Sequence, residues 1–259
     1  MSEQVKSQFP TEMVDIPSKG KLYPKEHPFS SGKVEMRYMT AKEEDIITSR
    51  TLIQKGIAFD RLLESLIVEK VDLNTLLLGD KNALMIAARV LGYGKDYKIT
   101  VNDPNDPQNK EEISVDLSNL KDKPVDFKKF ISNTRQFEVE LPLSKRKVIA
   151  RINDGKDENL IEADLKGLRK LAKTTGVVPE ITTRLIHSIV SIDGNDKKEA
   201  IRSFVNNELL AGDSSYLRDQ LYDMSPDLDM TTEWEDSNGE IQDIDIPINL
   251  DFFFPNARR

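Results

Sequence analysis

One stretch of the chain, residues 15–49, places the tightest limits on its fold. Ile-Pro-Ser-Lys-Gly at residues 16–20 is rich in turn formers. Over residues 33–39 apolar and charged side chains then alternate, which is the period of a half-buried strand. Thr40 follows with Glu43 three residues later, the spacing of a helix capping box. The stretch therefore predicts a turn-rich loop, one strand and a capped helix, and it holds no catalytic grouping.

Apolar side chains at helical spacing predict further helices. These lie over residues 60–70, from Asp80 as the N-cap to Gly92, from residue 157 onward, and over residues 179–192, 195–210 and 214–224. Asp213 is the expected cap of the last one.

Strand patterns interrupt these helices in the middle of the chain. Four short alternating segments, rich in Val, Ile and aromatic residues, predict a small antiparallel sheet. They cover residues 97–101, 112–117, 136–141 and 147–152. Near the C-terminal end, Asn238-Gly239 separates two further strand segments, and this dipeptide is a strong signal for a β-hairpin.

The pattern as a whole predicts an α+β fold that is mostly helical, with a small antiparallel β-sheet inserted mid-chain and a C-terminal β-hairpin. We expect five regions. They are a flexible N-terminus (1–14), an N-terminal strand with a helical region (15–96), a small antiparallel β region (97–152), a C-terminal helical region (153–229), and the β-hairpin with an aromatic tail (230–259).

Composition excludes several classes of protein. The 259 residues carry a net charge of −8, which argues against wrapping a nucleic-acid backbone. No cysteine is present, so disulfides, thiol nucleophiles and cysteine zinc sites are excluded. No apolar run reaches the roughly 18–20 residues of a membrane span, and no apolar signal core opens the chain. We therefore expect a cytosolic origin and no membrane partner.

Catalytic and metal-binding patterns are absent from the sequence. The two histidines, His27 and His187, do not occur at a metal-ligand spacing. The acidic run at residues 43–45 is explained by helix capping, and the run at residues 154–158 by a polar turn before a helix. We therefore predict no catalytic residue, no metal and no cofactor.

The triplet Phe252, Phe253 and Phe254 allows two interpretations. The tail can fold back and complete the core of its own chain. Alternatively, it can anchor the protein in a neighbouring subunit, since buried aromatic side chains dominate interface energetics. The sequence leaves both open.

Several longer phrases resemble one family. They are Ile-Pro-Ser-Lys-Gly-Lys-Leu-Tyr-Pro (16–24), Val-Glu-Met-Arg-Tyr-Met-Thr-Ala-Lys-Glu-Glu-Asp-Ile (34–46), Gly-Asp-Lys-Asn-Ala (79–83), Arg-Val-Leu-Gly-Tyr-Gly (89–94), Thr-Thr-Arg-Leu (182–185), Ser-Ile-Asp-Gly (191–194), Arg-Ser-Phe-Val-Asn-Asn (202–207), Pro-Asp-Leu-Asp (226–229), Ile-Pro-Ile (246–248) and Phe-Phe-Phe-Pro (252–255). Together they resemble baseplate hub and hub-assembly proteins of T-even-type contractile-tailed phages. The resemblance spans nearly the whole chain, from about residue 15 to residue 255.

This resemblance implies an assembly role without catalysis, as a hub component or as a chaperone-like assembly factor. It implies other baseplate hub proteins as partners, in the infected host cell and, for a hub component, in the virion tail baseplate. On this basis we expect partner contacts at Phe252, Phe253, Phe254, Tyr23 and Pro24. One departure stands out, because similar sequences often carry Cys-Pro-x-Cys-Gly where this chain has Asp-Pro-Asn-Asp at residues 103–106. A loop without those cysteines must hold its shape without zinc.

Two other function classes compete with assembly. A hydrolase using an acidic pair would need two close carboxylates with separated pKa values in one pocket. A role in nucleic-acid packaging would need a basic face. The sequence offers neither pattern, so an assembly role is favoured.

Overall fold

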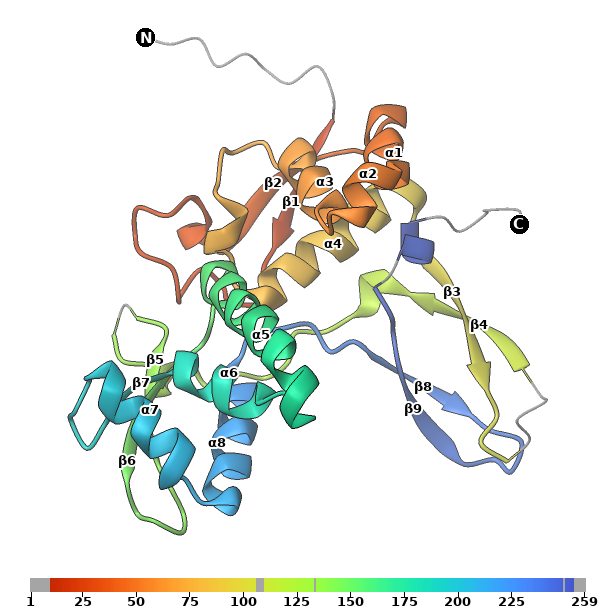
Figure 1. Ribbon diagram of the computed structural model, residues 1–259. Helices are drawn as coiled ribbons and strands as arrows, with labels where there is room; N and C mark the ends of the chain where they lie inside the picture. The colour runs from red at the N-terminus through yellow and green to blue at the C-terminus, as the bar shows by residue number, and fades with distance from the viewer. Residues whose placement is uncertain (1–9, 106–109, 133, 249, 254–259) are drawn as a thin grey trace, which may run out of the picture.

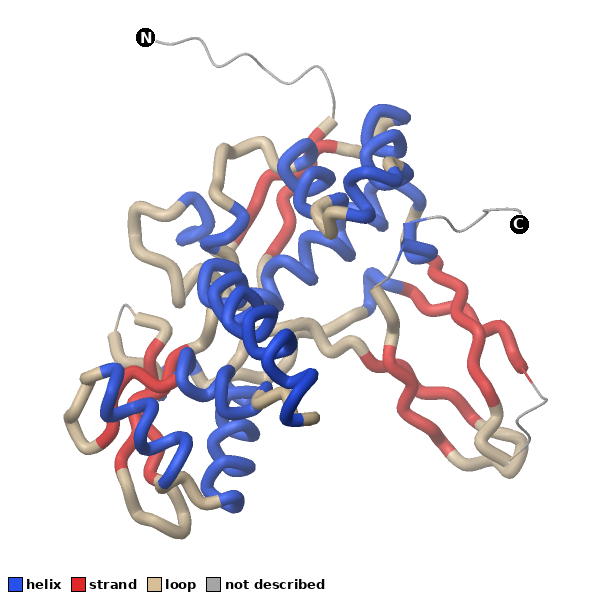
Figure 2. The backbone as a smooth tube through the Cα atoms, viewed as in Figure 1, coloured by secondary structure: helices blue, strands red, loops and turns tan. Residues whose placement is uncertain are grey.

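A computed structural model describes residues 10–105, 110–132, 134–248 and 250–253. The described chain is α+β and mostly helical, as the sequence predicts (Figures 1 and 2). The helices are α1 (Ala41–Thr48), α2 (Arg50–Gln54), α3 (Ala58–Leu66), α4 (Leu78–Tyr93), α5 (Gly155–Thr175), α6 (Glu180–Ser188), α7 (Lys198–Asn207) and α8 (Ala211–Met224). The strands are β1 (Thr11–Asp15), β2 (Lys33–Arg37), β3 (Asp96–Asn102), β4 (Lys110–Asp116), β5 (Gln136–Glu140), β6 (Lys147–Arg151), β7 (Ile189–Ile192), β8 (Thr231–Glu235) and β9 (Ile241–Asp245).

The N-terminal region combines β1, β2 and the helices α1 to α4 (Figure 1). β1 pairs antiparallel with β2, from Thr11 opposite Arg37 to Asp15 opposite Lys33. Residues 11–14 are therefore part of a strand, although the sequence suggested a flexible N-terminus up to residue 14. The capping box of α1 is present. The Thr40 side chain accepts a hydrogen bond from the backbone N–H of Glu43, and the Glu43 side chain accepts one from the backbone N–H of Thr40.

The mid-chain strands do not form one sheet. β3 and β4 make a two-stranded sheet, whereas β5, β6 and β7 make a separate three-stranded one. β7 lies in residues 179–192, which the sequence suggested were a single helix; α6 ends at Ser188 and the chain then pairs with β6. Alternating polarity identifies a strand, but the pairing partner is set by tertiary packing.

Two hairpins pack together as an arm on one side of the molecule (Figure 1). We call β3, β4, β8 and β9 the arm. The hairpin β8–β9 occurs where the Asn-Gly turn predicts it, and Gly239 has a φ of 80°. The hairpins are joined by a hydrogen bond from Trp234 Nε1 to Glu111 Oε2 (3.1 Å) and by contacts between their tips.

Two helices begin earlier than their acidic residues suggested. α4 begins at Leu78, so Asp80 lies inside its first turn rather than at the N-cap. α8 begins at Ala211, and Asp213 is likewise inside. Asp213 is fully buried and accepts hydrogen bonds from the backbone N–H groups of Leu143 and Ser144 (2.8 and 3.0 Å). Its carboxylate therefore anchors the β5–β6 loop instead of capping its own helix.

One continuous hydrophobic core runs through the described chain. It includes residues from β2, α3, α4, the three-stranded sheet and the short 3-10 helix Leu250–Phe253. Among the described residues, no helix combines the length and the hydrophobicity that crossing a membrane requires.

Candidate functional site: a junction around Asp80

Three segments that are far apart in the sequence meet at the start of α4. They are the loop between β1 and β2, which we call the N-terminal loop (residues 16–32), the first turn of α4, and residues 226–229. Each carries one of the phrases quoted above for the phage family. We call their meeting point the junction.

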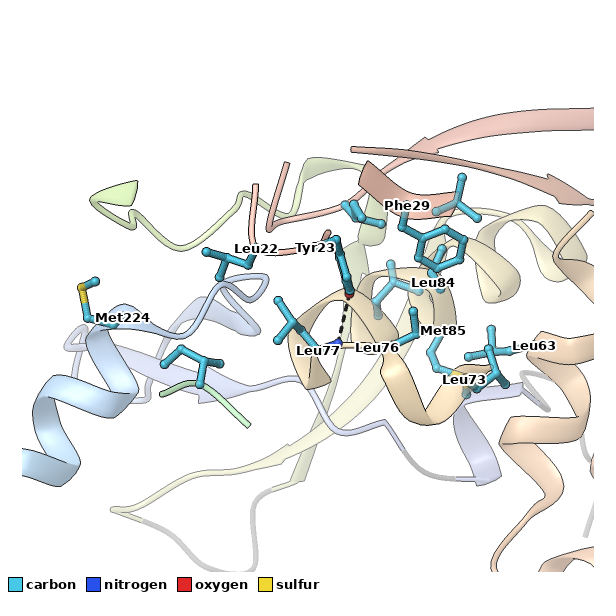
Figure 3. Packing of buried hydrophobic residues seen from close by; sticks show 14 of the residues in the cluster. Leu22, Tyr23, Phe29, Leu63, Leu73, Leu76, Leu77, Leu84, Met85 and Met224 are labelled. Atoms are coloured by element: carbon cyan, nitrogen blue, oxygen red, sulfur yellow. Dashed lines mark hydrogen bonds between the residues drawn. The ribbon is translucent and has the colours of Figure 1, made fainter. Parts of the chain in front are cut away.

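Asp80 lies at the centre of the junction and is fully buried. Its Oδ1 accepts a hydrogen bond from the backbone N–H of Ser18 (2.9 Å), and its Oδ2 accepts one from the hydroxyl of Tyr23 (2.7 Å). The same hydroxyl accepts a bond from the backbone N–H of Leu77 (3.0 Å), which Figure 3 shows as a dashed line. The Tyr23 hydroxyl thus links the loop to the start of α4 both as a donor, to Asp80, and as an acceptor, from Leu77.

Burial controls the protonation of this pair. It raises the pKa of Asp80, although the donors Ser18 and Tyr23 act in the opposite direction. It also raises the pKa of Tyr23, and the nearby charge of Asp80 adds to that effect. The phenol therefore keeps its proton and donates to the carboxyl.

The N-terminal loop is closed by two glycines. Gly20 and Gly32 have φ values of 72° and 77°, a region that favours glycine. A Cβ on Gly20 would lie 2.3 Å from the carbonyl oxygen of Ser30, so no side chain fits there. Within the loop, the His27 ring stacks on Tyr23 at a centroid distance of 4.4 Å. The backbone of the loop is therefore held in one conformation, and the exposed residues on its outer side have fixed positions.

Residues 226–229 close the other side of the junction. A Cβ on Gly79 would lie 1.9 Å from the carbonyl oxygen of Pro226, so the helix start and this segment touch backbone to backbone. Asn82 Nδ2 donates to the two carboxylate oxygens of Asp227 (3.2 and 3.3 Å). Burial raises the pKa of Asp227, and Asn82 opposes that effect. The backbone of Asp227 also accepts from Lys123 N–H (2.8 Å).

A cavity of about 880 Å³ adjoins the junction. Its lining includes both charged and apolar residues, among them Asp227, Asp229 and Glu158. These three carboxylates already accept hydrogen bonds, from Asn82, from the Thr231 backbone and side chain, and from Arg184 respectively. In the described part of the chain, no group of three or more His, Cys, Asp or Glu residues is arranged to hold a metal ion. The interactions of these three carboxylates are therefore hydrogen bonds to other residues of the chain.

The residues expected to contact partners fall in three kinds of place. Phe252 and Phe253 are fully buried, which agrees with the fold-back interpretation of the tail. A side chain with no exposed surface is not accessible to a partner in this conformation, so a contact through Phe252 or Phe253 would require the tail to detach. Phe254 lies outside the described residues. Tyr23 is buried and faces the junction, whereas Pro24 is exposed on the outer side of the N-terminal loop.

Sequence reasoning missed Arg89, which holds the tail in place. This side chain has no exposed surface. Its guanidinium donates to the carbonyl oxygens of Phe252 (2.7 Å), Gly94 (2.6 Å) and Asp96 (3.0 Å). Burial lowers the pKa of Arg89, yet an arginine remains charged in proteins. The available signal was a single charge inside the apolar stripe of α4, next to Val90.

Two buried carboxylates lie in the described part of the tip of the arm. Asp103, which stands at the first cysteine position of similar sequences, is buried and accepts from the backbone N–H groups of Asn105 (2.8 Å) and Ser237 (3.2 Å). Asp236, also buried, accepts from the side-chain amides of Asn105 (3.1 Å) and Gln242 (2.9 Å). These two carboxylates join the two hairpin turns. The sequence did not predict that this loop has a partner in the second hairpin.

Comparison with known proteins gives one match. A family described as T4 bacteriophage base plate protein matches residues 10–254. No curated protein and no solved structure matches the chain.

Proposed function

We propose that this chain, which belongs to the T4 bacteriophage base plate protein family, takes part in assembling the hub of the tail baseplate through protein–protein contacts. It would do so either as a hub component or as an assembly factor. The observation that carries this proposal is the extent of the family match, since residues 10–254 include the junction, both helical regions and the arm. The partners would be other baseplate hub proteins, met in the cytoplasm of the infected host and, for a component, retained in the virion baseplate.

The N-terminal loop is the surface that we propose for partner contact. The bonds between Tyr23 and Asp80 and the two closing glycines fix its shape before any partner arrives. A surface that is already ordered loses little conformational entropy on binding. Pro24, Lys25 and Glu26 are exposed along its outer edge. Pro24 therefore remains a proposed contact, while Tyr23 supports it from below.

Co-purification with co-expressed hub proteins tests this surface. The double variant Pro24→Glu with Lys25→Glu should reduce the amount of captured partner about tenfold or more, at an unchanged melting temperature. Lys55→Glu, an exposed substitution outside the loop, is the matched control. Unchanged capture by the double variant would refute the loop as the contact surface.

Mass spectrometry of purified phage particles distinguishes the two forms of the proposal. A component is present in mature tails at a fixed ratio to other hub proteins. An assembly factor is absent from tails, yet its deletion stops tail assembly. Normal tails in a deletion would contradict both forms.

A hydrolase using an acidic pair is the second candidate, and one observation favours it. Asp227, whose pKa is raised by burial, lines the same cavity as Asp223 and Asp229. Such an enzyme would need a second carboxylate free to activate water. Asp229 instead bonds Thr231, and Asp223 is exposed to solvent near the end of α8. The family match supports assembly, which we therefore favour. Turnover of a glycoside or ester substrate that disappears in Asp227→Asn, with the fold intact, would reverse this preference.

A further inference from the structure

A groove between α5, α6 and α7 lies outside the junction and has no role in the function proposed above. It consists of two cavities of about 640 and 310 Å³ that share Ile186, His187 and Arg202. We call it the helical groove. Its walls include the apolar side chains of Leu160 and Leu168 from α5. Leu160 is 57% exposed, so apolar surface is left uncovered along this face.

Gly167 opens one wall of the helical groove. A glycine in the interior of a helix costs about 0.5–1 kcal/mol relative to alanine. A Cβ at this position would meet nothing within 4 Å, so packing inside the described chain does not require glycine here. The open space over Gly167 allows the backbone or side chain of another segment to approach α5 closely.

The charges around the helical groove favour an acidic occupant. Lys170 and Arg202 line it and are exposed, and neither has an ion-pair partner among the described residues. Two carboxylates line the groove, Asp164 and Asp196, and Asp164 already contacts His187 Nε2 at 2.9 Å. Lys198 also lines it, so Lys170, Lys198 and Arg202 together outnumber the carboxylates. A matching occupant therefore carries an apolar side chain flanked by carboxylates.

The outer face of β8–β9 has this chemistry. Ile241 is 68% exposed on that face, directly opposite Glu235. Asp243, two residues along the same face, lies opposite Glu233, and like charges in this position repel each other. None of these three carboxylates is ion-paired within the described residues. The arm thus presents an uncovered apolar side chain among unneutralised acids.

We propose that the arm of one copy of this protein docks in the helical groove of a second copy. Ile241 would enter the space over Gly167, between Leu168 and Ile186. Glu235 and Asp243 would face Lys170 and Arg202. The two surfaces differ in charge and in hydrophobic character in the way that such a contact requires.

This contact joins two different surfaces, so it is head-to-tail. Head-to-tail contacts close into rings or extend as filaments, depending on the rotation between copies. Both surfaces are small, so the association is weak and sensitive to salt. The N-terminal loop is not involved, and loss of self-association would leave the function proposed above untouched.

Sedimentation velocity of the full chain, from about 1 to about 100 µM at low salt, tests the proposal. The wild-type protein should form larger species as concentration rises, and about 0.5 M salt should disperse them. Two charge reversals provide the decisive comparison: Lys170→Glu with Arg202→Glu in the groove, and Glu235→Lys with Asp243→Lys in the arm. Each reversed protein alone should associate at least about tenfold more weakly. An equimolar mixture of the two should recover the wild-type association, since each arm then meets a groove of opposite charge.

Controls keep the outcome interpretable. Lys55→Glu changes an exposed charge elsewhere and should associate as the wild type does. Ile241→Ser should weaken association without changing any charge. Circular dichroism of each variant establishes that it is folded. A wild-type protein that stays monomeric over the whole range would overturn the proposal, and so would association that survives the reversals or is not recovered in the mixture.

Discussion

The buried guanidinium of Arg89 offers the sharpest test of how the tail is held. We consider Arg89→Met, which keeps a long side chain of similar volume but removes the charge and all donors. The substitution breaks three hydrogen bonds to the carbonyl oxygens of Phe252, Gly94 and Asp96. It also leaves those oxygens without this partner in a site that has no exposed surface around the side chain.

The expected loss follows from these contacts. A hydrogen bond to a charged group contributes about 1.5–3 kcal/mol, and such contributions are not additive. Methionine avoids the cost of burying a charge, which offsets part of the loss. We therefore expect the free energy of unfolding to fall by about 3–5 kcal/mol. Arg61→Met, which removes an exposed arginine paired with Glu64, is the control and should cost less than about 1 kcal/mol.

Urea denaturation followed by far-ultraviolet circular dichroism measures this loss, because the single tryptophan lies in the arm and reports mainly on that part. A double-mutant cycle with Phe252→Ala shows whether Arg89 acts through the tail. We expect a coupling of about 1 kcal/mol or more, since the ring of Phe252 also lies 5.9 Å from the guanidinium carbon. A loss below about 1 kcal/mol for Arg89→Met, or strictly additive losses in the cycle, would refute the reasoning.

Three further predictions concern the junction, the groove and the arm. Gly79→Ala should destabilise the protein by about 3 kcal/mol or more, because its Cβ would overlap the carbonyl of Pro226. Gly167→Ala, where a Cβ meets nothing, should stabilise the protein by about 0.5–1 kcal/mol. Thermal unfolding of the two variants compares them, and equal effects would contradict the packing described. Tyr23→Phe should cost about 2–4 kcal/mol in urea denaturation because it leaves a buried carboxyl and a backbone N–H without their shared partner, and a loss near zero would show that the hydroxyl is dispensable. Burial raises the pKa of Asp236, but its N–H donors outweigh that effect and hold the pKa below the ordinary 3.8. The stabilisation from this carboxylate is therefore complete above pH 3.8 and is lost as the pH falls through the lowered pKa, so acid titration of tryptophan fluorescence should show a smaller stability loss below about pH 4 in Asp236→Asn. Identical profiles for the two proteins would contradict this account.

Local signals in the sequence predicted what depends on local structure. The capping box at Thr40 and Glu43 and the hairpin at Asn238-Gly239 both occur as predicted. In each case the interacting residues lie within a few positions of one another. Short-range hydrogen bonds and turn conformations are therefore readable without knowledge of the fold.

Long-range partners explain the misses. Asp80 resembled a helix cap, but its partners Ser18 and Tyr23 come from a loop about sixty residues away. Residues 189–192 had an apolar pattern that a helix also shows, and only β6 makes them a strand. Arg89 resembled an interruption of an apolar stripe until the tail supplied a carbonyl. In the candidate site, the sequence predicted a role for Tyr23 but did not identify Asp80 as its hydrogen-bond partner.

The bond between Arg89 and Phe252 has a consequence for the timing of synthesis. The two residues are 163 positions apart, so translation separates their appearance by about 10–30 s. During that interval the guanidinium of Arg89 lacks one of its three carbonyl acceptors, and the core lacks the rings of Phe252 and Phe253. A chain interrupted before Phe252 never completes it. Full packing of the core around Arg89 thus requires that translation has passed Phe252.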